Sequence, residues 1–120
     1  MTHCRHILNF ECQGVFTIGS GVSAARWVRL QVHGQSFLLN QIRKMVGLAL
    51  AVYRGIAPSG AVHIALDPSR DFSTPMAPEL GLFLCESVFT AYNARFGKDR
   101  EPLLLSDWEA DVEAFKLVRL

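Results

Sequence analysis

Residues 36–55 read SFLLNQIRKMVGLALAVYRG, and this stretch decides the fold that we expect. Its apolar residues recur at the i, i+4, i+7 and i+8 spacing of an α-helix. Ser36 is a suitable N-cap residue and Gly55 a suitable C-cap residue, so we predict a helix over residues 37–54. Apolar side chains occupy nearly its whole circumference, which is typical of a helix buried at the centre of a domain.

Two segments before this helix have the alternation of β-strands. Apolar and polar residues alternate over residues 7–16 and again over residues 26–33, and Gly19-Ser20-Gly21 supplies a turn between them. The pattern predicts a hairpin with one face on a core. We expect a third strand over residues 82–90, bounded by Gly81 and by a turn at Tyr92-Asn93. The predicted fold is therefore α+β, an antiparallel sheet of at least three strands packed against the central 37–54 helix.

Two further helices are expected at the periphery. One covers residues 58–66, and the other follows a capping box formed by Ser106 and Glu109, with Trp108, Val112 and Phe115 along one face. Residues 67–79 contain three prolines and predict a loop. A loop of this length often borders a functional site.

Composition narrows the class of protein. The chain has 120 residues, 50% hydrophobic and 19% charged, as in one globular domain. A net charge of +1 gives no global electrostatic argument for a nucleic-acid partner, so any RNA surface must come from local clusters of Arg and Lys. The polar residues Asn40, Gln41, Arg43 and Lys44 argue against a membrane span in the apolar stretch.

The cysteines indicate an intracellular protein with reduced thiols. Cys4, Cys12 and Cys85 are widely spaced and form no CxxC pair. Cys4 lies near His3 and His6, which can be read as a metal cluster, but no second ligand pair has zinc spacing. We therefore expect no metal site.

Arg43 is the most informative single residue. It lies within the most apolar helix, where a guanidinium must reach solvent or find a partner. It can extend to the surface or pair with a carboxylate of this chain. Alternatively, it faces a cleft and holds an anion, either a catalytic carboxylate or a phosphate. Lys44 points to another side of the helix and is expected to be solvated or to face RNA.

Residues 34–47, GQSFLLNQIRKMVG, resemble the signature helix of the TruA family of tRNA pseudouridine synthases, especially its eukaryotic branch. The resemblance covers most of the chain. Residues 32–34 (VHG), 54–55 (RG), 77–84 (APELGLFL) and 92–97 (YNARFG) fall in that family's order and spacing.

The resemblance implies an enzyme that isomerises uridine to pseudouridine in tRNA. In this family an aspartate initiates cleavage of the N-glycosidic bond, and no redox cofactor or metal is required. Arg43 matches the residue that forms an ion pair with that aspartate. Leu82 matches an apolar residue near the target uracil, although by alternation alone it can be an ordinary sheet residue. Four basic residues are candidates for phosphate contacts: Lys44, Arg26, Arg29 and Arg54.

The family's Arg-Thr-Asp-x-Gly-Val-His segment, which carries the catalytic aspartate, is absent from the sequence. Arg70-Asp71-Phe72 is the nearest match and does not fit, and Tyr53 and Tyr92 do not match the family's active-site tyrosine. We therefore expect residues 1–120 to be the C-terminal part of the catalytic domain, inactive without its N-terminal half.

That half, or a second copy in a homodimer, would cover an exposed apolar strip. Two other functions stay open, a non-catalytic RNA-binding module and a dimerisation module. The sequence does not distinguish nucleus, mitochondrion and cytoplasm.

Overall fold

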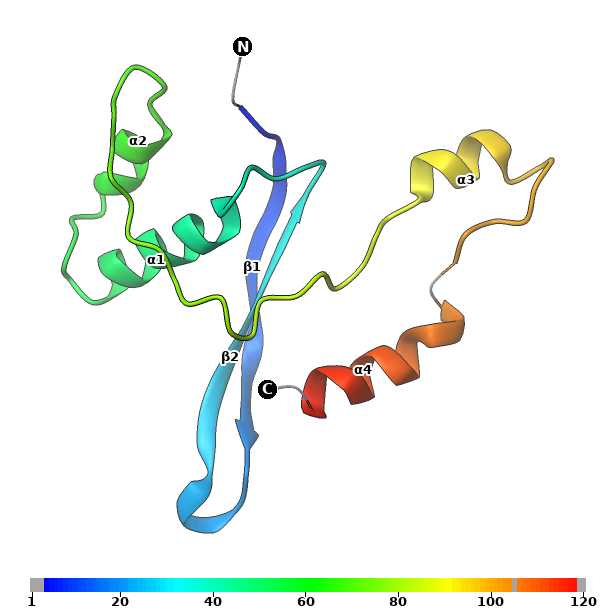
Figure 1. Cartoon of the computed structure of the whole chain (residues 1–120), viewed down its shortest axis with the longest axis horizontal. Helices are drawn as coiled ribbons and strands as arrows, with labels where there is room; N and C mark the ends of the chain where they lie inside the picture. Colours follow the sequence, from blue (N-terminus) through cyan, green and yellow to red (C-terminus); the bar gives the residue numbers. More distant parts are fainter. Residues whose placement is uncertain (1–3, 105, 119–120) are drawn as a thin grey trace. The chain divides into compact units, whose positions relative to one another are not determined.

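The computed structural model describes residues 4–104 and 106–118. Within them the chain has the α+β composition predicted, with a two-stranded antiparallel sheet. The chain forms two compact units, Met1–Glu79 and Leu80–Leu120. The elements, shown in Figure 1, are β1 (Ile7–Ile18), η1 (Gly21–Ser23), β2 (Ala25–Gly34), α1 (Gln41–Tyr53), α2 (Ala61–Leu66), α3 (Thr90–Phe96), η2 (Ser106–Trp108) and α4 (Glu109–Val118).

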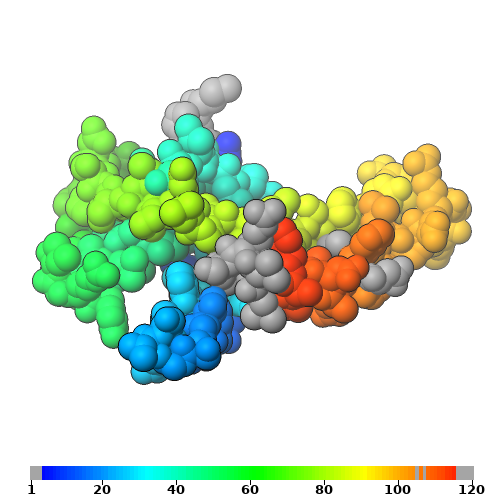
Figure 2. Space-filling view, turned by 60° about the horizontal axis from the view of Figure 1, so that its bottom comes forward, coloured from blue at the N-terminus to red at the C-terminus, as the bar shows by residue number. Residues whose placement is uncertain are grey.

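The predicted hairpin is confirmed. β1 and β2 pair antiparallel, with Cys12 opposite Leu30 and Val15 opposite Val28. The register shifts between Cys12 and Gly14, where Gly14 has a φ of 127°, a region that favours glycine. The apolar face is open rather than packed on a core, because Val15 and Val28 are 55% and 54% exposed. In Figure 2 the turn end of the hairpin, in blue, stands apart from the green surface of α1 and α2.

The start of α1 differs from the prediction. Ser36 is not the N-cap residue, and the helix begins at Gln41 instead of residue 37. Asn40, the residue before it, has a φ of 59° in the left-handed region, which a right-handed helix cannot pass through. The Leu38 N–H donates to the Gln41 side-chain oxygen at 2.8 Å, so a tight turn replaces the predicted first turn of helix.

The end of α1 agrees with the prediction. Gly55 follows the helix with a φ of 70° and donates its N–H to the Val52 carbonyl at 3.0 Å. The Ile56 N–H donates to the Ala51 carbonyl at 2.9 Å. This pair of bonds is the Schellman arrangement, which needs a left-handed residue and therefore favours glycine.

The core of the first unit is small. Its buried apolar residues are Leu48 and Ala51 of α1, Ala61 of α2 and Ala77 of the predicted loop. The prediction of a helix buried all round is not met, since Tyr53 is 88% exposed. Among the described residues, α1 is covered on one side only.

The second unit corrects the predicted third strand. Residues 82–89 have no assigned strand, and Thr90 begins α3, so Tyr92 and Asn93 lie in a helix and not in a turn. An apolar-rich run between turn signals does not make a strand by itself, because a strand also needs a partner for its backbone hydrogen bonds. The predicted terminal helix is present, beginning with the 3-10 turn at Ser106. Within the described residues, no helix is long and apolar enough to cross a membrane.

Candidate active-site residues around Arg43

The Arg43 guanidinium is held by groups of the first unit. Its Nε donates to the Ala77 carbonyl at 2.8 Å, and its Nη1 lies 3.3 Å from Asn40 Oδ1 and 3.4 Å from Glu79 Oε2. The side chain is 20% exposed. Within the described part of the chain, Nη2 has no hydrogen-bond partner. Two of the three guanidinium nitrogens are therefore engaged, and the third is available to an anion.

The contact with Glu79 bears on the two interpretations of Arg43. Pairing with a carboxylate of this chain is observed, so the sequence-based view that its partner lies elsewhere is incomplete. The Glu79 side chain is 78% exposed, however, and a water-exposed ion pair contributes little free energy. The ion pair with a catalytic aspartate outside these residues stays a prediction.

The loop over residues 67–79 was expected to border a site, and it carries two of the groups around Arg43. Figure 1 shows it returning past α1. The Ala77 N–H donates to the Arg43 carbonyl at 3.0 Å, and Ala77 is only 9% exposed. The loop is thus fixed to the helix at the arginine itself.

Sequence reasoning missed Asn40, Ala77 and Glu79 as contacts of Arg43. A signal existed for Asn40, because asparagine is the residue other than glycine that adopts left-handed backbone most readily. Ala77 and Glu79 lie in the quoted segment APELGLFL, but no pattern paired that segment with Arg43.

The other predicted site residues lie outside these contacts. Lys44 and Arg54 are exposed on and just after α1, and Arg26 is exposed on β2. Arg29 is half-buried, with its guanidinium carbon 5.5 Å from the centre of the Phe16 ring. Leu82 belongs to the second unit and is 48% exposed.

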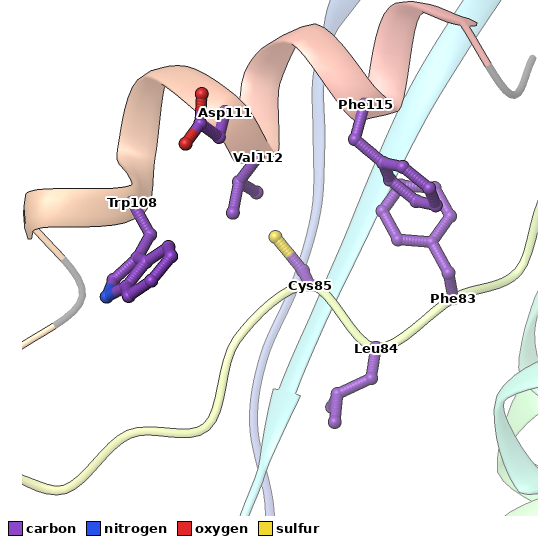
Figure 3. A pocket seen from close by; sticks show the side chains of 7 residues that line it. All are labelled: Phe83, Leu84, Cys85, Trp108, Asp111, Val112 and Phe115. Atoms are coloured by element: carbon purple, nitrogen blue, oxygen red, sulfur yellow. The ribbon is translucent and has the colours of Figure 1, made fainter.

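The second unit has an apolar cavity of about 260 Å³ between residues 83–85 and the terminal helix. Figure 3 shows Phe83 and Cys85 directed toward α4 and Leu84 directed away. The rings of Phe83 and Phe115 meet edge to face, with centres 6.4 Å apart. Trp108, Val112 and Phe115 all line the cavity, as their predicted common face requires. Leu82 does not line it.

The described residues contain no group of three His, Cys, Asp or Glu side chains suited to a metal ion. Of the cluster considered from the sequence, His3 lies outside the described residues, and Cys4 and His6 are exposed.

Fold and site together define the class of protein: an α+β chain whose first unit presents a half-buried arginine from a helix. The family model of tRNA pseudouridine synthases matches residues 2–90. The chain therefore belongs to the tRNA pseudouridine synthase family, as its signature helix indicated.

Curated relatives agree over nearly the whole chain. The human pseudouridylate synthase 1 homolog is 41% identical over 115 residues, which are 94% of this chain and 26% of the relative. The tRNA pseudouridine synthase 1 of Candida glabrata is 40% identical over 114 residues, 94% of this chain and 20% of the relative. The tRNA pseudouridine synthase 1 of Schizosaccharomyces pombe is 34% identical over 114 residues, which are 93% of this chain and 20% of the relative. The chain thus spans about a quarter or less of the length of these relatives.

Proposed function

We propose that this chain is part of an enzyme that isomerises uridine to pseudouridine in tRNA. The reaction replaces the bond from ribose to a uracil nitrogen by a bond to a uracil carbon. It involves no net oxidation or reduction, so it needs positioned charge rather than a redox partner. In this proposal Arg43 forms an ion pair with the catalytic aspartate, which the rest of the catalytic domain supplies.

The observation that carries the proposal is the state of the Arg43 guanidinium. It is 20% exposed, it is fixed through Nε and Nη1, and among the described residues Nη2 lacks a partner. A cation held in place and partly shielded from water stabilises a nearby carboxylate more strongly than a mobile surface cation. Nη2 offers two N–H donors to such a carboxylate.

The exposed apolar face of the hairpin supports the view that this chain is one part of a larger domain. We infer that residues 1–120 form the C-terminal part of the catalytic domain and that the N-terminal half covers the open face of the hairpin. Val15, Val28 and Leu30 remain 41% to 55% exposed. In the same way, residues 82–89 would become the predicted third strand when a strand of that half pairs with them. Their backbone has no assigned helix or strand in the described chain, so its hydrogen-bonding groups are open to a pairing strand.

Recognition of tRNA by this chain is also part of the proposal. Lys44, Arg54 and Arg26 are exposed and free to contact phosphates, whereas Arg29 already lies against Phe16. Leu82 is proposed to pack near the target uracil. Replacing a residue that contacts phosphate should reduce the dependence of tRNA affinity on salt concentration.

The test uses the protein expressed from its complete gene. Pseudouridine formation is followed in tRNA labelled with tritium at C5 of uridine, because the new carbon bond releases that tritium to water. Arg43→Ala is expected to lower the turnover number by about 100-fold or more, the loss typical of a removed electrostatic contact at an active site. Its affinity for tRNA should change by less than about threefold, since one phosphate contact at most is involved.

Arg70→Ala is the matched control, because Arg70 is 61% exposed and, among the described residues, pairs with Asp67 three positions earlier. It should leave turnover unchanged. Turnover by Arg43→Ala equal to that of the wild type would overturn the role of Arg43. Failure of the wild-type protein to form pseudouridine in any tRNA would overturn the function.

A further inference from the structure

Gly47 lies on α1 one helical turn after Arg43, directly beneath the loop that holds the guanidinium. A Cβ atom built on Gly47 would lie 2.1 Å from the Pro75 carbonyl oxygen and 2.8 Å from the Pro75 carbonyl carbon. It would also lie 3.1 Å from the Ala77 nitrogen. These are backbone atoms, so no side-chain rotation relieves the overlap. Any other residue at this position must displace the loop.

The backbone of Gly47 does not itself require glycine. The residue is in the interior of a regular helix, where alanine is the better helix former and glycine weakens the helix. The presence of glycine at position 47 is therefore explained by the lack of room for a Cβ atom. The space is occupied by residues 75–77, which bring the Ala77 carbonyl to Arg43 Nε and the Ala77 N–H to the Arg43 carbonyl.

We propose that Gly47 is a positioning residue for Arg43: it admits the loop that fixes the guanidinium through Ala77 and leaves Nη2 open to the catalytic carboxylate. This inference rests on the proposed function. Nε donates to the loop at Ala77, and Nη1 contacts Asn40 before α1 and Glu79 of the loop, so these bonds restrain the guanidinium while the loop stays in place. In this proposal Gly47 acts only through Arg43.

The consequence for catalysis is geometric. A displaced loop removes the Ala77 acceptor from Nε, and the long arginine side chain becomes free to change rotamer. The charge of Arg43 remains, and so does its ability to attract tRNA. A small misplacement of a charged group is sufficient to cost a large factor in rate, while substrate binding is nearly unaffected.

Gly47→Ala tests the inference in the protein expressed from its complete gene. Gly60→Ala is the matched control, because Gly60 also has helical backbone, with a φ of −64°, and, apart from its chain neighbours, no described residue has an atom within 4 Å of its Cβ position. We expect Gly47→Ala to lower kcat by about tenfold or more and to change KM for tRNA by less than about threefold. Gly60→Ala should change neither.

A spectroscopic readout separates positioning from stability. In protein labelled with ¹⁵N-arginine, the Nε–H signal of Arg43 is assigned by its loss in Arg43→Lys. In Gly47→Ala this signal should shift and exchange with water about tenfold faster or more, because its acceptor is displaced. In Gly60→Ala the signal should match the wild type.

A measurement on the wild type keeps the test decisive if Gly47→Ala does not fold. The Arg43 Nε–H and the Ala77 amide are released by the same opening of the loop, so their hydrogen exchange should respond in parallel to denaturant. Independent exchange of the two groups would overturn the inference.

A displaced Arg43 signal with unchanged kcat in Gly47→Ala would overturn the inference while leaving the proposed function intact. A wild-type protein without turnover would overturn the proposed function and the catalytic role of Gly47 together, whatever the Arg43 signal shows.

Discussion

Arg43 and Ala77 are joined by two hydrogen bonds in opposite directions. The Arg43 Nε–H donates to the Ala77 carbonyl at 2.8 Å, and the Ala77 N–H donates to the Arg43 carbonyl at 3.0 Å. The first bond fixes the side chain and the second fixes the loop to the helix backbone. Both involve main-chain groups of Ala77, so the connection depends on the path of the loop and not on the alanine side chain.

The exposed contact between Arg43 and Glu79 should contribute little to stability. Glu79→Gln keeps an oxygen acceptor beside Nη1 and removes the charge. Because Glu79 is 78% exposed, we expect the free energy of unfolding to change by less than about 0.5 kcal/mol. Denaturant unfolding at low and at high salt measures this. A loss larger than about 1 kcal/mol would show that the pair is more strongly coupled than its exposure indicates.

The Schellman ending of α1 predicts a specific cost at Gly55. Gly55→Ala places a Cβ in left-handed backbone at a φ of 70°, although no described residue beyond its chain neighbours has an atom within 4 Å of it. The cost should therefore be conformational, about 1 kcal/mol of unfolding free energy. Gly55→Asn should cost less, because asparagine tolerates this region. Thermal unfolding compares both with Gly60→Ala, which has no such penalty; equal stability of all three would contradict the explanation.

In the second unit, Asn93 connects α3 to the segment after it. Its side-chain amide donates to the Leu103 carbonyl at 2.8 Å, and its side-chain oxygen accepts from the Leu103 N–H at 2.9 Å. Asn93→Ala removes both bonds and should cost about 1–3 kcal/mol of local stability. Asn93→Asp keeps the acceptor and should lose less. The hydrogen exchange of the Leu103 amide reports the loss; if Asn93→Ala leaves that exchange unchanged, the bonds do not hold this segment.

The hydrogen bonds of the Asp67 carboxylate should make the free energy of unfolding depend on pH. The Ser69 hydroxyl and the Ser69 N–H both donate to Asp67 Oδ1, at 2.6 Å and 2.9 Å, and these bonds lower the pKa of Asp67. Because the folded pKa is the lower one, the stabilisation is present above the ordinary pKa of an aspartate and is lost as the pH falls through the lowered value.

Ser69→Ala removes the larger of these two contributions. The pKa of Asp67 should rise toward its ordinary value in the variant, so that less stability is lost on acidification. Ser69→Thr keeps the hydroxyl and is the control. A ¹³C NMR titration of the Asp67 carboxyl measures all three proteins, and an unchanged titration in Ser69→Ala would contradict the assigned cause.

Local patterns predicted the elements whose stability is local. The hairpin follows from alternation around a glycine turn, and the end of α1 follows from Gly55. The start of α1 was misplaced because Asn40 adopts a left-handed conformation that apolar spacing does not reveal. The third strand was wrong because an apolar-rich run bounded by Gly81 does not form a strand by itself, and residues 82–89 have no strand to pair with in the described chain.

For the candidate site, the sequence singled out Arg43 but not the groups that contact it. Arg43 could be found because a charge within an apolar helix needs an explanation. Its contacts through Asn40 and Ala77 could not, because one depends on an unusual backbone conformation and the other on main-chain atoms of a loop 34 positions away. Main-chain acceptors leave no trace in the identity of the residue that supplies them.

The close approach of the loop to Gly47 also affects how natural variants of this gene should be interpreted. Every missense change at that codon introduces a Cβ atom. Even a small side chain such as that of alanine or serine therefore overlaps the loop. If Arg43 has its proposed role, a family member that keeps arginine at position 43 but has lost glycine four residues later should bind tRNA without modifying it. The two positions should be scored together in judging whether such an allele or paralogue is active.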